Sequence, residues 1–367
     1  MHVYIHVPFC ARRCTYCDFA IAVRREVPSA AFADAVLAEW RRWQDDPAWA
    51  HSPGQLSTVY FGGGTPSRLA PSTIERMLAG LDALRPISPG AEITLEANPE
   101  DVTAPAARAW AAAGVNRVSL GAQSFDPGVL AWMHRTHSAE DIFRAVTVVR
   151  DAGIPELSLD LIFGLPDSLA RDWQADLDRA LALEPEHLSL YGLTVEAHTP
   201  LARQVVRGET SPADEDRYAA EFLAAHAALV TRGYEHYEVS NAARPGHRAR
   251  HNSAYWRRAL FIGLGPSAHS GFAAERRWNI REWSAWDAAV RAGRPTEAGR
   301  ETLDPLAIRL ESLYLGLRTT EGVPETDVDP ATVARWEREG WATREGGRIR
   351  LTAEGWLRMG ALVRDAA

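Results

Sequence analysis

Three cysteines near the start of the chain are its clearest candidates for chemistry. Cys10, Cys14 and Cys17 form a CxxxCxxC run, and the 367-residue sequence contains no other cysteine. Four-iron iron–sulfur clusters are held by cysteine thiolates. Three thiolates would leave one iron of such a cluster without a protein ligand, and chemistry can occur at that iron. The run therefore favours a [4Fe-4S] cluster with one open corner.

Zinc and disulfide bonds are the alternatives for the same thiols. A zinc site would need a fourth ligand, for which His2 and His6 are candidates, but zinc motifs usually pair two knuckles and this run stands alone. Disulfides would leave one of three cysteines unpaired, and nothing before Cys10 resembles a secretion signal. Zinc stays open as the weaker alternative.

The composition excludes several classes of function. All 40 basic residues are arginine, so Schiff-base and pyridoxal chemistry at a lysine are excluded. The formal net charge is −8, which argues against generic nucleic-acid binding, because phosphate neutralisation needs a basic face. No apolar stretch approaches the roughly 18 residues that a membrane span needs. We expect a cytoplasmic protein without a transmembrane segment.

The elements that must position these residues alternate between strands and helices over the first two hundred residues. Short β-rich runs cover residues 3–7, 58–61, 92–96, 116–120, 157–163 and 187–190. Helical patterns between them cover residues 30–43, 71–84, 103–113, 138–152 and 168–183. This alternation predicts an α/β fold with a parallel sheet. By analogy with barrels, we expect reactive groups at the carboxyl ends of the strands.

Further candidate residues lie at these strand ends. A GGG motif at 62–64 follows the second strand, and glycine lets the backbone approach a ligand closely. Glu96 ends the third strand, Gln123 follows the fourth, and Asp160 lies inside the fifth. A carboxylate in an apolar strand must find a partner, so a buried salt bridge is the alternative to a ligand for Asp160.

The cysteine run, the strand before it and Tyr16 together resemble the radical S-adenosylmethionine (SAM) superfamily. The resemblance implies that Cys10, Cys14 and Cys17 hold a [4Fe-4S] cluster whose fourth iron is chelated by SAM. It also implies a partial (β/α)6 TIM-like barrel that stays open. Within this family pattern, the residues implied to bind the cofactor are Tyr4, Gly63, Gly64, Thr65, Glu96, Gln123, Arg135 and Asp160.

A second motif, HNxxYW at residues 251–256, is similar to the HemW family of haem chaperones. Imidazole is a common axial ligand of haem iron, and the resemblance implies that His251 contacts haem. A lone histidine is more often a surface or packing residue, which is the alternative. The implied partners are haem and apo-haemoproteins, including respiratory ones. A reductant protein and peripheral membrane contact are both compatible with this reading.

Oxygen-independent coproporphyrinogen III oxidases are relatives of that family and give the alternative function. They extend the run to CxxxCxxCxC and carry a substantial segment before it. Here Phe19 stands at the place of the fourth cysteine, and nine residues precede Cys10. The resemblance therefore favours a haem chaperone, and we do not expect oxidase activity. Whether SAM is cleaved is left open.

The chain divides into three predicted parts. They are a partial barrel at 1–235, a family-specific extension with the HNxxYW motif at 236–300, and a winged-helix-like α+β domain at 301–367. The last part shows helical stretches followed by a strand–turn–strand pattern, with a final helix after Thr352. From Arg300 onward 10 arginines oppose 12 acidic residues, which disfavours DNA binding. We expect a packing or interaction domain.

Overall fold

A single large sheet organises the protein, whose computed structural model describes residues 1–50, 52 and 54–366. Within these residues the sheet has twelve strands in the order β14-β13-β12-β11-β1-β4-β5-β6-β7-β8-β10-β9. Its centre is a run of parallel strands: β1 (His2–Val7), β4 (Leu56–Gly63), β5 (Ile87–Ala97), β6 (Arg117–Gln123), β7 (Glu156–Phe163) and β8 (His187–Gly192). These six strands match the six β-rich runs, and the parallel sheet that the alternation predicts is confirmed.

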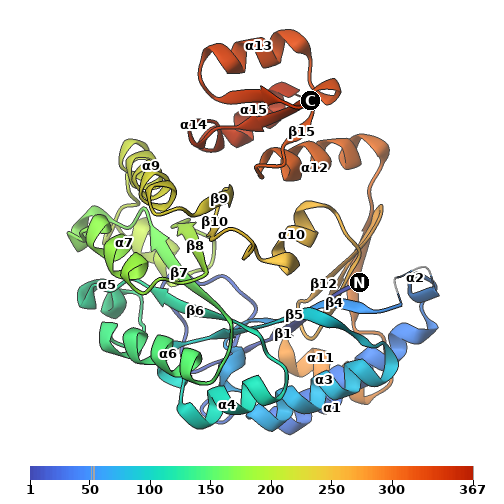
Figure 1. Ribbon diagram of the computed structural model, residues 1–367. Coiled ribbons are helices and arrows are strands. Elements are labelled where there is room, and N and C mark those ends of the chain that lie inside the picture. The colour runs from blue at the N-terminus through green and yellow to red at the C-terminus, as the bar shows by residue number, and fades with distance from the viewer. Residues whose placement is uncertain (51, 53, 367) are drawn as a thin grey trace.

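Helices between the parallel strands cover the outer face of the sheet (Figure 1). They are α1 (Ser29–Arg42), α3 (Pro71–Leu84), α4 (Ala104–Ala112), α5 (Pro127–Trp132), α6 (Ala139–Asp151), α7 (Trp173–Ala182), α8 (Pro200–Val206) and α9 (Glu215–Thr231). Side-chain caps fix several starts: Ser138 forms a capping box with Asp141, and Asp172 accepts from the amide of Ala175. Several short elements complete this region. They are the helix α2 (Pro47–Ala50), the strands β2 (Phe9–Cys10) and β3 (Ala22–Val23), and the 3-10 turns Trp43–Asp45, Pro66–Arg68, Pro99–Asp101 and Asp167–Leu169.

The two faces of the central strands differ in polarity because side chains alternate along a strand. Apolar residues such as Val3, Ile5, Val59, Leu95 and Leu159 are buried against the helices. The inner face is polar, which is unusual for parallel strands that are covered on both sides. It carries Tyr4, Tyr60, Glu96, Ser119, Ser158 and Asp160, which hydrogen-bond with neighbours from the same face. This polar interior is where a site can form.

Residues after 235 extend the sheet at both edges. At one edge β10 (Asn241–Ala243) and β9 (Glu235–Glu238) add antiparallel strands to β8. At the other edge β11 (Phe261–Leu264) pairs in parallel with β1, followed by antiparallel β12 (His269–Phe272), β13 (Glu275–Asn279) and β14 (Glu297–Thr302). The barrel is therefore open. Segment 236–300 also contains α10 (Arg250–Trp256) and α11 (Trp283–Arg291), and its strands are continuous with the main sheet.

The C-terminal region forms a small separate layer at the top of Figure 1. Its elements are α12 (Pro305–Leu317), β15 (Val323–Pro324), a 3-10 turn (Glu325–Asp327), α13 (Pro330–Arg338), β16 (Ala342–Glu345), β17 (Arg348–Leu351), α14 (Ala353–Trp356) and α15 (Met359–Ala366). The predicted hairpin is β16–β17, and β15 pairs with β17 on its other side. Trp336 and Ile349 are fully buried within this layer. In the described part of the chain, no helix is both long and apolar enough to cross a membrane.

Candidate functional site

The loop that follows β1 brings the three cysteines to the carboxyl ends of the parallel strands. Cys10 lies in β2, which pairs with β3. Beyond it, the amide of Thr15 donates to Met133 O at 3.4 Å and its hydroxyl donates to Trp132 O at 2.6 Å. The loop is thus attached at both ends, by β3 and by the end of α5. All three cysteines are free thiols that line one cavity of about 490 Å³.

The cavity gathers ten of the twelve residues that the sequence proposes for the site. They are Cys10, Cys14, Cys17, Gly63, Gly64, Thr65, Glu96, Gln123, Arg135 and Asp160. Eight of them come from the loop after β1 or from the end of a following strand and its loop, whereas Asp160 lies inside β7 and Arg135 follows α5. Tyr4 and His251 are not among the lining residues. The expectation that carboxyl strand ends meet at one site therefore explains eight of these positions.

Burial and hydrogen bonding have opposite effects on the pKa values of Cys10 and Cys17. Burial raises the pKa of Cys17 to about 11 and also raises that of Cys10, although the Thr65 hydroxyl donates to Cys10 Sγ at 3.4 Å and opposes the shift. Arg135 Nη1 lies 3.8 Å from Cys14 Sγ. Among the described residues, no three His, Cys, Asp or Glu side chains converge closely enough to hold one metal ion. A single zinc ion needs such convergence, whereas a cluster presents a separate iron to each thiolate.

The glycine motif passes between the end of β1 and Glu96 with no room for side chains. A Cβ on Gly62 would lie 2.9 Å from Glu96 Oε1, and one on Gly64 would lie 2.8 Å from the backbone of Pro8. Gly63 has a φ of +109°, which favours glycine, and its amide donates to Glu96 Oε2 at 3.0 Å. The glycines are thus required by close backbone approach, and they form a cradle along one wall of the cavity.

Glu96 and Asp160 are carboxyl groups without an ion-pair partner in the described part of the chain. Glu96 also accepts from the Tyr60 hydroxyl at 2.8 Å, and Asp160 accepts from the Ser119 hydroxyl at 3.0 Å. Burial, with a smaller contribution from the Asp160 charge, raises the pKa of Glu96 to about 7. Burial likewise raises that of Asp160 to about 6. A salt bridge, the alternative for Asp160, is not formed, and the pair suits a cationic ligand.

Arg135 and Gln123 complete the opposite wall. Arg135 Nη2 donates to Asn98 Oδ1 and to Gly121 O, both at 2.7 Å, while its buried Nε has no protein partner in the described residues. Gln123 ends β6 at a register shift against β7 and has a φ of +66°, which is uncommon for a residue with a side chain. Such backbone conformations persist where the surroundings enforce them.

Sequence reasoning left several lining residues unassigned. Asn98, Ser119 and Tyr191 line the same cavity. Asn98 directly follows β5, and Tyr191 is the second-last residue of β8. The expectation that functional residues lie at the carboxyl ends of strands could therefore have found both. Ser119 lies within β6 opposite Ser158, and only the hydrogen bond from its hydroxyl to Asp160 shows its role.

Tyr4 lies beneath the glycine motif rather than in the cavity. Its hydroxyl hydrogen-bonds with His6 Nδ1 at 3.1 Å, and its ring stacks with Tyr60 at a centroid distance of 6.0 Å. A Cβ on Gly62 would also meet the Tyr4 ring at 2.9 Å. In this conformation Tyr4 packs against the glycine motif and is not among the residues that line the cavity.

His251 lies in the barrel interior near the amino ends of the strands, away from the cysteines. It is 1% exposed, and both ring nitrogens are engaged: Nδ1 with Thr58 Oγ1 at 2.6 Å and Nε2 with the Tyr255 hydroxyl at 2.8 Å. Its ring stacks on Tyr60 at 5.0 Å. Burial lowers its pKa to about 3, so the imidazole is neutral. In this conformation no nitrogen is free for a haem iron.

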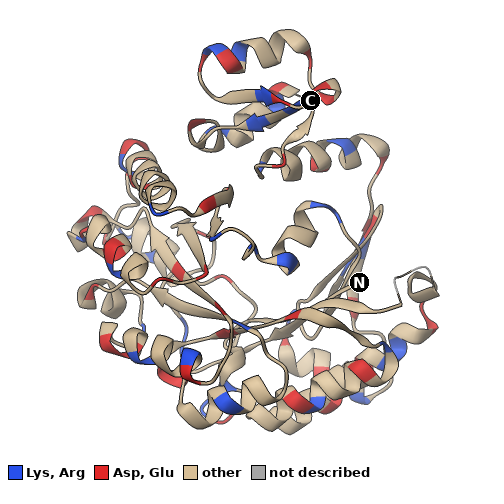
Figure 2. Ribbon diagram, in the orientation of Figure 1, with Lys and Arg blue, Asp and Glu red and all other residues tan. Residues whose placement is uncertain are grey.

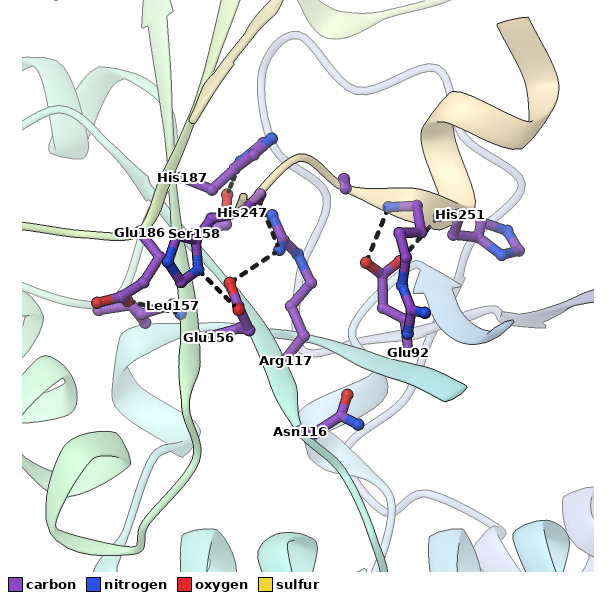
Figure 3. Close-up of polar contacts among 12 residues, drawn as sticks. Glu92, Asn116, Arg117, Glu156, Leu157, Ser158, Glu186, His187, His247 and His251 are labelled. Atoms are coloured by element: carbon purple, nitrogen blue, oxygen red, sulfur yellow. Dashed lines mark hydrogen bonds and ion pairs between the residues drawn. The ribbon is translucent and has the colours of Figure 1, made fainter. Parts of the chain in front are cut away.

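Polar contacts fix the segment around His251 to the amino ends of the strands (Figure 3). The carboxylate of Glu92, a residue of β5, accepts hydrogen bonds from the amides of Arg250 and His251, both at 2.8 Å. Glu156 at the start of β7 contacts His247 Nδ1 at 2.8 Å and Arg117 Nη1 at 3.4 Å. Deeper in the same region, Ser158 Oγ hydrogen-bonds with His187 Nδ1 at 2.8 Å. This segment therefore closes the end of the barrel opposite the cavity.

Comparisons with known proteins agree with this geometry. The sequence profile of the radical SAM superfamily matches residues 4–180. The haem chaperone HemW of Synechocystis is 38% identical over 330 residues, which cover 87% of this chain and 78% of the relative. HemW of Mycobacterium tuberculosis is 36% identical over 368 residues, covering 99% and 93%.

Among solved structures, coproporphyrinogen III oxidase from Escherichia coli, described as a radical SAM enzyme, superposes with a TM-score of 0.80. The alignment covers 99% of this chain and 89% of that one at 22% sequence identity. At this identity the likeness shows the fold alone. Together with the open sheet, it confirms the expected radical SAM fold.

Proposed function

Because the chain belongs to the HemW family of the radical SAM superfamily, we propose that it is a haem chaperone. It binds a [4Fe-4S] cluster, SAM and haem, and it transfers haem to apo-haemoproteins. The observation that carries the first part is the shared cavity, in which three free thiols, a glycine cradle and two carboxyl groups without ion-pair partners meet.

The donor set of the cavity fits the cluster and SAM. Cys10, Cys14 and Cys17 would hold three irons, and soft thiolates are the usual protein ligands of such clusters. Glu96 and the backbone of Gly63 and Gly64 would bind the SAM amino group, and the ionised Glu96 would balance its charge. The chemistry that a bound and reduced cluster would supply is one-electron reduction of the SAM sulfonium, and the protein would position the two groups.

Anaerobic reconstitution with iron and sulfide tests the cluster. We expect a stoichiometric four-iron cluster in the wild-type chain and its loss in Cys14→Ala. His2→Ala serves as the matched control, because His2 is also a candidate zinc ligand but its Nδ1 bonds with Thr58 Oγ1, away from the residues that line the cavity. Material that contains zinc, and neither iron nor sulfide, would contradict the proposal.

Haem contact by His251 requires that α10 move, since both imidazole nitrogens are bonded in the structure. This gives a paired test by absorbance titration with haem. If His251 is the axial ligand, His251→Ala loses the imidazole-type spectrum, and Tyr255→Phe binds haem more tightly because Nε2 has lost its partner. Unchanged spectra in both variants remove His251 from the haem site and leave the cluster proposal intact.

Haem transfer and oxidase activity are separated by two assays. The haem-loaded chain, mixed with the apo form of a b-type haemoprotein, should give the spectrum of the holo client. Incubated anaerobically with SAM, a reductant and coproporphyrinogen III, it should form no protoporphyrinogen. Formation of that product would favour the oxidase alternative. The respiratory clients, a reductant protein, membrane contact and the cytoplasmic location stay predictions, which fractionation and client capture test.

A further inference from the structure

A second cleft lies between α10 and the C-terminal layer. It has a volume of about 310 Å³, and its lining includes Ser253, Trp256 and Arg257 from the end of α10 with Gly316, Val323 and Arg348 from the C-terminal elements. In Figure 1, α10 lies below α12 and β15 on this side of the molecule. The cleft shares no lining residue with the cysteine cavity.

The lining of the cleft is rich in cations. Four arginines line it, Arg248, Arg257, Arg258 and Arg348, together with two acidic residues, Glu321 and Asp327. Figure 2 shows blue segments at both ends of α10, although the chain as a whole is acidic. Arg248 and Arg258 pair with Glu235 and Glu311, which lie outside the lining, so Arg257 and Arg348 are the cations open to an anionic ligand. Planar guanidinium groups bind carboxylates well.

Arg348 differs from the other arginines of the cleft in that its hydrogen bonds go to backbone carbonyls. Its Nε donates to Glu321 O at 2.6 Å and its Nη2 donates to Gly322 O at 2.8 Å, and it has no carboxylate partner in the described part of the chain. Arg257 pairs with Glu321, but these side chains are 62% and 44% exposed. Exposed ion pairs are weak, so an incoming carboxylate can compete for both arginines.

Trp256 adds a flat apolar surface and an unused donor. Its indole Nε1 is buried and has no partner among the described residues, although buried indole N–H groups are usually hydrogen-bonded. Its ring lies under the Arg318 guanidinium, 4.4 Å from the ring centroid. A ligand that combines carboxylates with a flat aromatic body would use both the cations and this ring.

The HNxxYW motif therefore presents residues to two different places. His251 contacts Thr58 and Tyr60 in the barrel, whereas Trp256 lines the cleft. The cleft volume is at the lower end of the roughly 300–1,000 Å³ found for pockets that bury drug-sized ligands. It suits one edge of a tetrapyrrole rather than the whole ring.

We propose that this cleft binds the propionate-bearing edge of haem, with Arg348 and Trp256 as donors to the carboxylates. The proposal rests on the proposed haem-chaperone function and adds to it the place where haem docks on the chain.

Haem titration of the full chain, followed by absorbance, tests the proposal in two arms. In the first, Arg348→Gln and Trp256→Phe should each weaken haem binding about tenfold, the order expected for loss of a hydrogen bond to a charged group. Arg335→Gln is the matched control, because it removes an arginine of the same layer that pairs with Asp365 outside the cleft. It should bind haem like the wild type.

The second arm uses haem dimethyl ester, which keeps the ring and iron but lacks both carboxylates. The wild type should bind the ester at least tenfold more weakly than haem, because the ester removes the acceptors of both donors, and Arg348→Gln should cause no further loss with the ester. Equal binding of haem and ester, or variants that bind haem like the wild type, overturns the cleft while leaving the haem function standing. A wild-type chain that binds no haem overturns both proposals.

Discussion

Two carboxyl groups define the chemistry of the cavity at the scale of single residues. Glu96 and Asp160 lie on neighbouring parts of the polar inner face and receive only neutral donors. Burial without a cation raises the pKa of both groups, which is the reverse of what an ion pair would do. Burial makes the ionised form of both carboxyl groups unfavourable, and a bound cationic ligand would stabilise that form.

Stability of the ligand-free chain should depend on pH through Glu96. Between its ordinary pKa of 4.5 and the shifted value of about 7, the folded chain keeps the proton that the unfolded chain has lost. The contribution of Glu96 to the free energy of unfolding should therefore fall as pH rises through this window, whereas buried histidines such as His251, whose pKa burial lowers to about 3, contribute in the opposite direction. Urea denaturation of the wild type and of Glu96→Gln at a series of pH values isolates the Glu96 contribution: the stability of the wild type relative to the variant should fall as pH rises from 4.5 to 7.

Glu100 provides the matched control for that experiment. It lines the same cavity, but hydrogen bonds, with His137 first, lower its pKa to about 2. Its contribution to stability is present above about pH 4.5 and is lost as pH falls towards 2. Glu100→Gln should thus leave the slope between pH 4.5 and 7 unchanged. Equal slopes for Glu96→Gln and the wild type would contradict the assignment.

At the scale of elements, the turn after β4 depends on the absence of side chains. The added Cβ of Gly64→Ala would meet backbone atoms of Val7 and Pro8 at 2.8 Å, and these atoms cannot rotate away. We expect a loss of about 1–3 kcal/mol in the free energy of unfolding, with weaker SAM binding. Denaturant midpoints and SAM titration measure the two effects.

Gly54→Ala is the control for that change, since its added Cβ would meet no heavy atom within 4 Å. It should leave both stability and SAM binding near the wild-type values. If Gly64→Ala behaves like Gly54→Ala, close approach of the backbone does not explain the glycine motif.

Local sequence patterns predicted most helices and strands but not how distant elements pair. The helix expected at 71–84 has those bounds in the structure, whereas the one expected from 168 begins at Trp173, because Asp172 caps it and Ala170 has a left-handed φ of 48°. Pairing of β11 with β1 places Phe261 opposite His2. Such non-local pairing leaves no trace in local periodicity, so the sheet edges built by residues 236–300 were not foreseen.

The same limit applies to the candidate site. The family resemblance named the ten lining positions, and for eight of them the convergence of parallel strands at one edge gives the physical reason. The position of His251 could not, since its burial depends on contacts with Thr58 and Glu92, far away in the sequence. A sequence motif shows which residue types are present, but it does not show the direction in which a helix points each side chain.

At the scale of the whole molecule, we expect the fold not to depend on the cluster. Only the loop between β1 and α1 carries the thiols, and it is attached by β3 and by Thr15, while the core lies between sheet and helices. A triple Cys10→Ser, Cys14→Ser, Cys17→Ser variant should melt close to the metal-free wild type in circular dichroism. SAM should raise the melting temperature only of the cluster-loaded wild type, because ligands stabilise the state that binds them. Unfolding of the triple variant would contradict this.

The capping of α10 by Glu92 has a consequence for how its motion can be followed. The amides of Arg250 and His251 donate to a side-chain carboxylate rather than to a backbone carbonyl, so they lose their acceptor as soon as the helix leaves the barrel. The rate of deuterium uptake at these two amides thus reports how often α10 separates from the barrel. If haem accelerates that uptake, the histidine is being released towards the iron.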